Sequence, residues 1–219
     1  MEGAEDMNIP PRIAIGIIIL FHIVGLVGLS LPATKPLFLQ IVPFHLLLML
    51  GVIVFSHHKL NSSFGIFILL IFWLGFLAEW IGVNKGWLFG SYAYDTTLGV
   101  KLSGIPLMIG VNWFLLIYAT GVAMQRSRLK SPFFRVITGA AVLVLLDLLI
   151  EPIAIKFDYW HWNSPRIPLE NYICWFLVSM VMLYIFEQFR FKKQSIAAPA
   201  LLVTEFVFFG LLNLVVILL

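Results

Sequence analysis

The sequence predicts an all-α integral membrane protein, a bundle of about seven transmembrane helices with two aromatic-rich outer loops. Of its 219 residues, 61% are hydrophobic and only 11% are charged, whereas a soluble domain of this size needs a far more polar surface. Seven apolar stretches are long enough to cross a bilayer, which takes roughly 17 to 25 helical residues. Most connections between them are short, which favours one transmembrane domain over residues 1–219.

The first apolar stretch follows an acidic and polar segment, residues 1–12, that does not resemble the charged region of a signal peptide. We therefore expect the first stretch to remain as a helix. The predicted helices lie near residues 13–31, 37–55, 64–83, 105–124, 133–155, 171–189 and 199–219.

The two longest connections, residues 84–104 and 156–170, mix glycine with aromatic residues. Aromatic rings bury too much area to be left in water, so both loops should be ordered. They are either re-entrant turns at the interface or a lid over the outer end of the bundle.

The orientation follows from lysine and arginine, which are enriched on the cytoplasmic side of membrane proteins. One side of the bundle collects Arg12, Lys59, Arg126, Arg128, Lys130, Arg190, Lys192 and Lys193, and the other has Lys35, Lys85, Lys101, Lys156 and Arg166. This bias predicts that the N-terminus is cytoplasmic and the C-terminus outside, and we expect the protein in the bacterial inner membrane. Both long loops then lie on the outer face.

Tryptophan is concentrated at the outer end of the predicted bundle. Six of the seven tryptophans fall there: Trp80, Trp87, Trp113, Trp160, Trp162 and Trp175. An aromatic belt would decorate both interfaces, so the asymmetry favours an aromatic pocket at the outer end.

Acidic residues inside apolar helices are costly and usually face the bundle interior. Asp147 and Glu151 are four residues apart and share one helix face, while Glu79 and Asn112 lie at the same outer level on two other helices. Two carboxyl groups in a low dielectric cannot both ionise comfortably, so one of the Asp147–Glu151 pair should hold a proton and could act as a general acid. Such polar residues can also simply join helices through hydrogen bonds.

Other features restrict the chemistry. Glu205 lies near the cytoplasmic end of the last helix and looks separate from the cluster, and His57 and His58 fall in a cytoplasmic loop as solvated residues. Histidines at metal-binding spacing, glycine-rich nucleotide motifs and a lysine in the last helix are missing. We therefore expect no metal, no cofactor and no nucleic acid partner, and proton chemistry remains.

Several segments that together cover the central half of the chain form a recognisable pattern. They are Glu79 to Asn84, Gly86 to Gly90 with Tyr92 and Tyr94, Gly110 to Trp113, Asp147 with Glu151 to Ala154, and Asp158 to Trp162. In these segments the chain resembles the integral-membrane carotenoid 1',2'-hydratases, which include the γ-carotene and bisanhydrobacterioruberin hydratases. The resemblance implies addition of water to the terminal 1,2 double bond of an acyclic ψ end group of a carotenoid, giving a tertiary alcohol.

That reaction fits the acid cluster, because protonation at C-2 leaves a tertiary cation at C-1 that water captures. Aromatic faces stabilise a cation by roughly 0.5 to 2 kcal/mol each. We expect Asp147 or Glu151 to be the acid and Glu79 to position water or complete the cluster. The predicted substrate-binding residues are Trp80, Asn84, Trp87, Tyr92, Tyr94, Asn112, Trp113, Asp158, Trp160, His161 and Trp162, with Asn112 and His161 near the water.

Three alternatives stay open from the sequence. An acid-driven carotene cyclase would form a similar cation but close a ring. A small transporter or proton channel would use the carboxyl groups as a relay. A carotenoid-binding protein without activity would tolerate their neutralisation. The partners expected in each carotenoid case are the carotenoid, water and the lipid bilayer, and the oligomeric state stays unpredicted.

Overall fold

The computed structural model describes residues 8–218 and confirms the predicted fold class, because seven of its helices are long and apolar enough to cross a membrane. They are α1 (Pro11–Ser30), α2 (Lys35–Phe55), α3 (Ser62–Lys85), α4 (Leu107–Arg126), α5 (Pro132–Lys156), α6 (Leu169–Gln188) and α7 (Ala197–Leu218). Every helix end lies within two residues of the predicted one. The prediction for the acidic N-terminal segment falls mainly on residues 1–7, which lie outside the described part. Leu219, the predicted end of the last helix, also lies outside it.

Local sequence explains where several helices begin. Proline occupies the first turn of α1, α2 and α5, where a missing N–H costs nothing because the first helical N–H groups have no intrahelical partner. The Asn61 side chain caps α3 by accepting a hydrogen bond from the Phe64 N–H at 3.0 Å. The helix starts are therefore determined locally, while the apolar runs determine the lengths.

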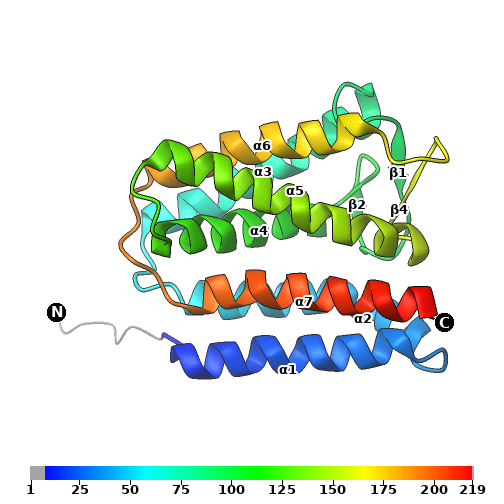
Figure 1. The fold of residues 1–219 in the computed structure, drawn as a ribbon, viewed down its shortest axis with the longest axis horizontal. Coiled ribbons are helices and arrows are strands. Elements are labelled where there is room, and N and C mark those ends of the chain that lie inside the picture. Colours follow the sequence, from blue (N-terminus) through cyan, green and yellow to red (C-terminus); the bar gives the residue numbers. More distant parts are fainter. Residues whose placement is uncertain (1–7, 219) are drawn as a thin grey trace.

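Helix α4 lies at the centre of the bundle, and 72% of the residues in its span are buried. It packs against α3, α5 and α7, and also touches α2 and α6. Helix α1 lies at the edge, where its main neighbours are α2 and α7. Figure 1 shows all helices running along the same axis, with the start of α1 and the end of α7 at opposite ends of the bundle.

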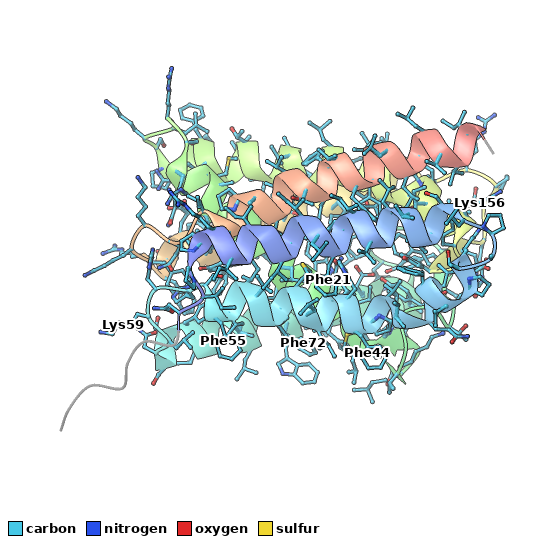
Figure 2. The ribbon with its side chains drawn as sticks, turned by 90° about the horizontal axis from the view of Figure 1, so that it is seen from below. Phe21, Phe44, Phe55, Lys59, Phe72 and Lys156 are labelled. Carbon is cyan, nitrogen blue, oxygen red and sulfur yellow. The ribbon has the colours of Figure 1, made fainter. Side chains whose placement is uncertain are left out.

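The outer surface of the bundle suits a bilayer. Large apolar side chains such as Phe44 and Leu69 are exposed along the helices. Lysines lie at the two ends, with Lys59 at one end and Lys156 at the other in Figure 2. The distribution matches a membrane protein whose sides contact hydrocarbon and whose ends contact water.

The two long connections pair with each other at one end of the bundle. Four short strands form there: β1 (Tyr92–Tyr94), β2 (Lys101–Leu102), β3 (Ile105–Pro106) and β4 (Trp160–Trp162). β1 and β4 are antiparallel, with Tyr92 opposite Trp162 and Tyr94 opposite Trp160, and β2 pairs with β3. The β1–β4 ribbon joins loops that are far apart in sequence and covers the end of α5 (Figure 1).

The prediction that His57 is solvated is wrong. The His57 side chain is only 2% exposed, and its Nδ1 lies 2.6 Å from the Tyr118 hydroxyl oxygen. Its ring stacks on that of Phe64, with the ring centroids 3.6 Å apart. Burial lowers the pKa of His57 to about 4, so the ring is neutral at physiological pH. His58, by contrast, is exposed as predicted.

Candidate active site

Glu79 lies in a cage of hydrogen-bond donors at the outer end of α3. Its side chain is buried. Oε2 accepts hydrogen bonds from the hydroxyl groups of Tyr92 at 2.5 Å and Tyr94 at 2.7 Å, and Oε1 accepts one from the Trp113 indole N–H at 3.0 Å. Donors from β1 and α4 therefore fix this carboxylate, and a buried carboxylate needs such partners.

Two glycines on α3 leave room for this cage. A Cβ on Gly82 would lie 2.6 Å from the Tyr92 hydroxyl oxygen, and a Cβ on Gly75 would lie 2.5 Å from Trp113. Both distances are below van der Waals contact, so only glycine lets these two donors approach the helix. The spacing of small residues along α3 thus determines where Tyr92 and Trp113 can reach Glu79.

Tyr92 and Tyr94 remain neutral phenols in this setting. Burial, followed by the negative charge of Glu79, raises the pKa of each tyrosine well above its ordinary value of 10. Each hydroxyl therefore keeps its proton at physiological pH and donates it to Glu79.

Asp147 and Glu151 lie on the buried face of α5 and share one partner. That face repeats at helical spacing through Leu143, Leu146, Asp147, Ile150, Glu151 and Ala154. The Asn171 amide on α6 donates to Asp147 Oδ2 at 2.8 Å and to Glu151 Oε1 at 3.2 Å. Asp147 Oδ1 is buried without a hydrogen-bond partner among residues 8–218.

The β1–β4 ribbon supplies two further donors to Glu151. Its Oε2 accepts hydrogen bonds from the indole N–H groups of Trp162 at 2.9 Å and Trp160 at 3.2 Å. Because side chains alternate along a strand, Trp160 and Trp162 lie on the same face of the ribbon as Tyr92 and Tyr94. One face of the ribbon therefore holds both Glu79 and Glu151.

A small cavity of about 30 Å³ lies between these carboxyl groups. Its polar lining includes Glu79, Glu151, Asn112 and Asn171, and its walls are aromatic. A cavity of this volume admits one or two water molecules, which need two to four polar partners. Asp147 does not line this cavity and reaches it through Asn171.

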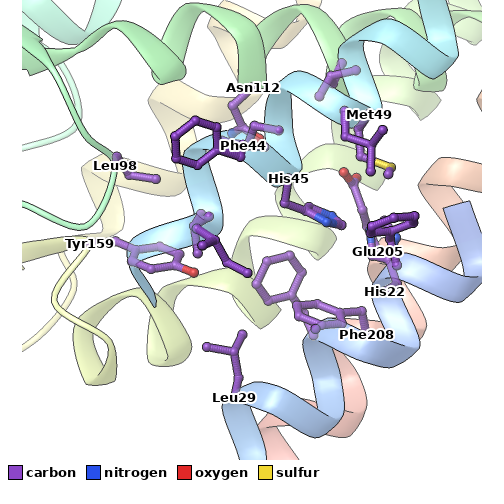
Figure 3. A pocket seen from close by; sticks show the side chains of 18 of the residues that line it. His22, Leu29, Phe44, His45, Met49, Leu98, Asn112, Tyr159, Glu205 and Phe208 are labelled. Carbon is purple, nitrogen blue, oxygen red and sulfur yellow. The ribbon is translucent and has the colours of Figure 1, made fainter. Parts of the chain in front are cut away.

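A much larger apolar cavity, about 360 Å³, adjoins the small one. The two share Ile109, Asn112 and Trp160 as lining residues. Phe21 on α1 and Phe44 on α2 line the large cavity and are 41% and 68% exposed, so it opens to the lipid-facing surface between these helices (Figure 2). Figure 3 shows the large cavity with Asn112 and Tyr159 at its border.

Five residues predicted to bind substrate lie outside both cavities: Trp80, Asn84, Trp87, Asp158 and His161. His161 occupies the opposite face of β4 from Trp160 and Trp162, where its Nδ1 lies 2.9 Å from Asp95 Oδ2. His161 therefore lies away from the small cavity, which does not favour the predicted contact with the water.

The other four residues lie outside the cavities for different local reasons. Trp80 follows Glu79 directly, so it lies about 100° around the helix, and it packs under Lys85. Trp87 is 78% exposed beyond the end of α3. Asn84 donates to the Ser103 carbonyl at 3.3 Å, and Asp158 is an exposed turn residue with φ of 53°.

Two residues of this cluster are not among the predicted site residues, although the sequence already places Trp175 with the outer tryptophans. Asn171 bridges the α5 carboxyl groups, and Trp175 stacks on Trp113 with ring centroids 4.5 Å apart. Both lie on one face of α6, four residues apart and at the outer level, so their position on the chain could have identified them.

A second polar group lies deeper in the large cavity and was also missed. It consists of Glu205, His22 and His45. Glu205 is distant from the other carboxyl groups in the sequence and was predicted to stand apart. In the structure it shares the large cavity with two histidines, which lie in the middle of apolar helices, and such intramembrane polar residues are a signal of function.

Comparison with known proteins identifies the family. Residues 41–219 match the family described as carotenoid biosynthesis protein. The chain belongs to this family. A bisanhydrobacterioruberin hydratase from Haloarcula japonica is 29% identical over 125 residues, which cover 54% of this chain and 42% of that relative. The match thus spans less than half of the relative's length. No solved structure matches the chain.

Membership of the carotenoid biosynthesis family fits the cavities. The large cavity is mainly apolar, opens toward lipid and adjoins the polar cluster. Membership of the family supports a role in carotenoid biosynthesis.

Proposed function

We propose that this protein is a cofactor-independent carotenoid hydratase that adds water to the terminal 1,2 double bond of an acyclic ψ end group. The observation that carries the proposal is the contact between the two cavities at Asn112 and Trp160. An apolar space large enough for part of a carotenoid there meets a polar space sized for water. A hydratase needs both, side by side.

In the proposed reaction, a carboxylic acid donates its proton to C-2 and the π electrons of the double bond form the new C–H bond. The resulting cation at C-1 is captured by the water in the small cavity, and the water's proton passes to a carboxylate. Atoms and charge balance without an oxidant or reductant. The faces of Trp160 and Trp175 and the nearby carboxylates would stabilise the cation.

We assign the proton transfer to Glu151, with Asp147 as its partner in the acid pair; the Asn171 amide donates to both carboxyl groups and fixes their positions. Glu151 lines the small cavity, whereas Asp147 does not. Glu79 lines it as well and, like Glu151, accepts three hydrogen bonds, but those of Glu79 are shorter, at 2.5, 2.7 and 3.0 Å against 2.9, 3.2 and 3.2 Å for Glu151, so they hold Glu79 more firmly as a carboxylate. Glu79 would therefore act as a fixed negative charge that stabilises the cation.

We also propose where the protein lies in the cell and how it is oriented in the membrane. The chain would act as one transmembrane domain of the bacterial inner membrane, with its N-terminus cytoplasmic and the carboxyl cluster near the outer face. The lysine and arginine distribution supports this orientation. The carotenoid would enter from the bilayer between α1 and α2, where the large cavity is open.

Co-expression in a bacterium that accumulates lycopene or γ-carotene tests the activity. The expected result is a more polar pigment, heavier by one water. An isomeric cyclic pigment would support the cyclase alternative. Unchanged pigment, with the protein shown to be folded in the membrane, would contradict the hydratase.

A further inference from the structure

The inner part of the large cavity contains a polar group that the proposed reaction does not use. Glu205 on α7, His22 on α1 and His45 on α2 all line it. They lie near the middle of their helices, and the surrounding lining is apolar, including Met49 and Phe208. Figure 3 shows the three polar side chains gathered at one end of the cavity, away from Tyr159 and Leu98.

Of these three polar side chains, the Glu205 carboxyl group has a buried oxygen whose hydrogen-bonding role is unexplained. It is only 9% exposed, and its Oε2 has no hydrogen-bond partner among residues 8–218. A buried polar atom without a partner is costly. Because the side chain points into a cavity (Figure 3), a ligand can supply the missing partner.

The two histidines are arranged to complement such a ligand. His22 Nδ1 lies 2.7 Å from the Ile18 carbonyl oxygen, which requires a hydrogen on Nδ1 and leaves Nε2 as an acceptor in the neutral ring. The His22 and His45 rings meet edge to face with centroids 4.8 Å apart. The group therefore offers the His22 acceptor, with the His45 ring against it, beside a carboxyl group.

We propose that Glu205, His22 and His45 recognise a hydroxyl group carried by the isoprenoid chain of the ligand. A hydroxyl group both donates and accepts, so it can satisfy a histidine acceptor and the carboxyl group together. The apolar lining excludes a water-soluble ligand, and an isoprenoid alcohol combines an apolar chain with one such oxygen. On α2 the lining runs from Phe38 to Met49, about 16 Å along the helix, which suits a short isoprenoid segment.

This inference deepens the proposed function, since it names a ligand class for the same cavity and rests on a carotenoid-type chain binding there. The ligand's terminal double bond would lie toward Asn112 and Trp160, and its hydroxyl group would lie toward Glu205. Binding can be measured without turnover, so hydration and hydroxyl recognition can fail separately.

The test is competition for radiolabelled farnesol on the full chain in lipid nanodiscs. The competitors are unlabelled farnesol and its deoxy hydrocarbon, which has the same chain without the oxygen. One or two net hydrogen bonds predict that the wild-type protein binds farnesol about 3- to 100-fold more tightly than the hydrocarbon. Glu205→Met and His22→Leu should each reduce this preference by about 3- to 10-fold.

The control is Met49→Leu, which changes the apolar lining and should leave the ratio of the two affinities unchanged. Competitor concentrations are taken as those in the bilayer, and because the same ratio is compared between proteins, any remaining difference in membrane partitioning cancels. Glu205→Gln, which can still donate and accept, should retain part of the preference. Equal binding of the two competitors by the wild-type protein would overturn the proposal, as would a preference that persists in both Glu205→Met and His22→Leu.

Discussion

Replacing Glu151 by glutamine tests the assignment of the proton donor. Trp160 and Trp162 both donate to Glu151 Oε2, and a glutamine carbonyl can accept both. Only the side toward Asn171 changes, from an acceptor to an N–H₂ group, and that mismatch costs about one hydrogen bond, ~0.5–1.5 kcal/mol. The protein should therefore fold, while the loss of a general acid should lower turnover by about 10² to 10⁴, or ~2.7–5.4 kcal/mol in the barrier.

The assay is hydrated carotenoid formed per folded protein, with folding checked by gel filtration and thermal unfolding in detergent. Glu170→Gln is the matched control, because Glu170 is exposed at the start of α6 beside Asn171 and lines neither cavity. Its turnover should equal that of the wild-type protein. Turnover of Glu151→Gln within about tenfold of the wild-type value would refute the assignment of Glu151 as the acid.

Three further predictions concern stability and can be checked by unfolding in detergent. Tyr94→Phe removes one hydrogen bond to the Glu79 carboxylate and should lower the free energy of unfolding by about 1.5–3 kcal/mol; an unchanged value would mean that the cage does not hold Glu79. Gly82→Ala places a methyl group against the Tyr92 hydroxyl and should lower the free energy of unfolding by about 1–3 kcal/mol. Gly65→Ala is the matched control, because its methyl group meets nothing within 4 Å, and it should lower the free energy of unfolding less than Gly82→Ala does. Glu205→Met removes a buried oxygen without a partner and should stabilise the ligand-free protein by about 1–3 kcal/mol; a loss of stability would indicate a structural role.

The helices and the level of the carboxyl cluster could be predicted because each depends on local sequence. An apolar run needs a minimum length to cross the hydrocarbon, and a four-residue spacing puts Asp147 and Glu151 on one face. The central helices carry enough polar and small residues to show which face is buried. The cluster of Glu79, Asp147 and Glu151 was therefore visible before the structure.

The loop residues were harder because their orientation depends on pairing between distant segments. The register of β1 with β4 turns Trp160 and Trp162 toward Glu151 and His161 away from it, and a shift of one residue would reverse this. Nothing within either loop determines that register.

The inner polar group depends on tertiary packing in the same way. Helices α1, α2 and α7 are apolar around most of their circumference, so their sequences do not reveal which faces meet. Only the packing of α1 against α2 and α7 brings His22, His45 and Glu205 to one cavity.

The most direct test of the proposed hydration is an isotope measurement on the purified protein with an acyclic carotenoid. The reaction is run in deuterated water and, separately, in water labelled with heavy oxygen. Acid-catalysed hydration predicts one deuterium at C-2 and one labelled oxygen at C-1 of the tertiary alcohol, and Glu151→Gln should form little of either product. A pigment whose oxygen does not come from water, or one that gains deuterium without oxygen, would contradict the hydratase.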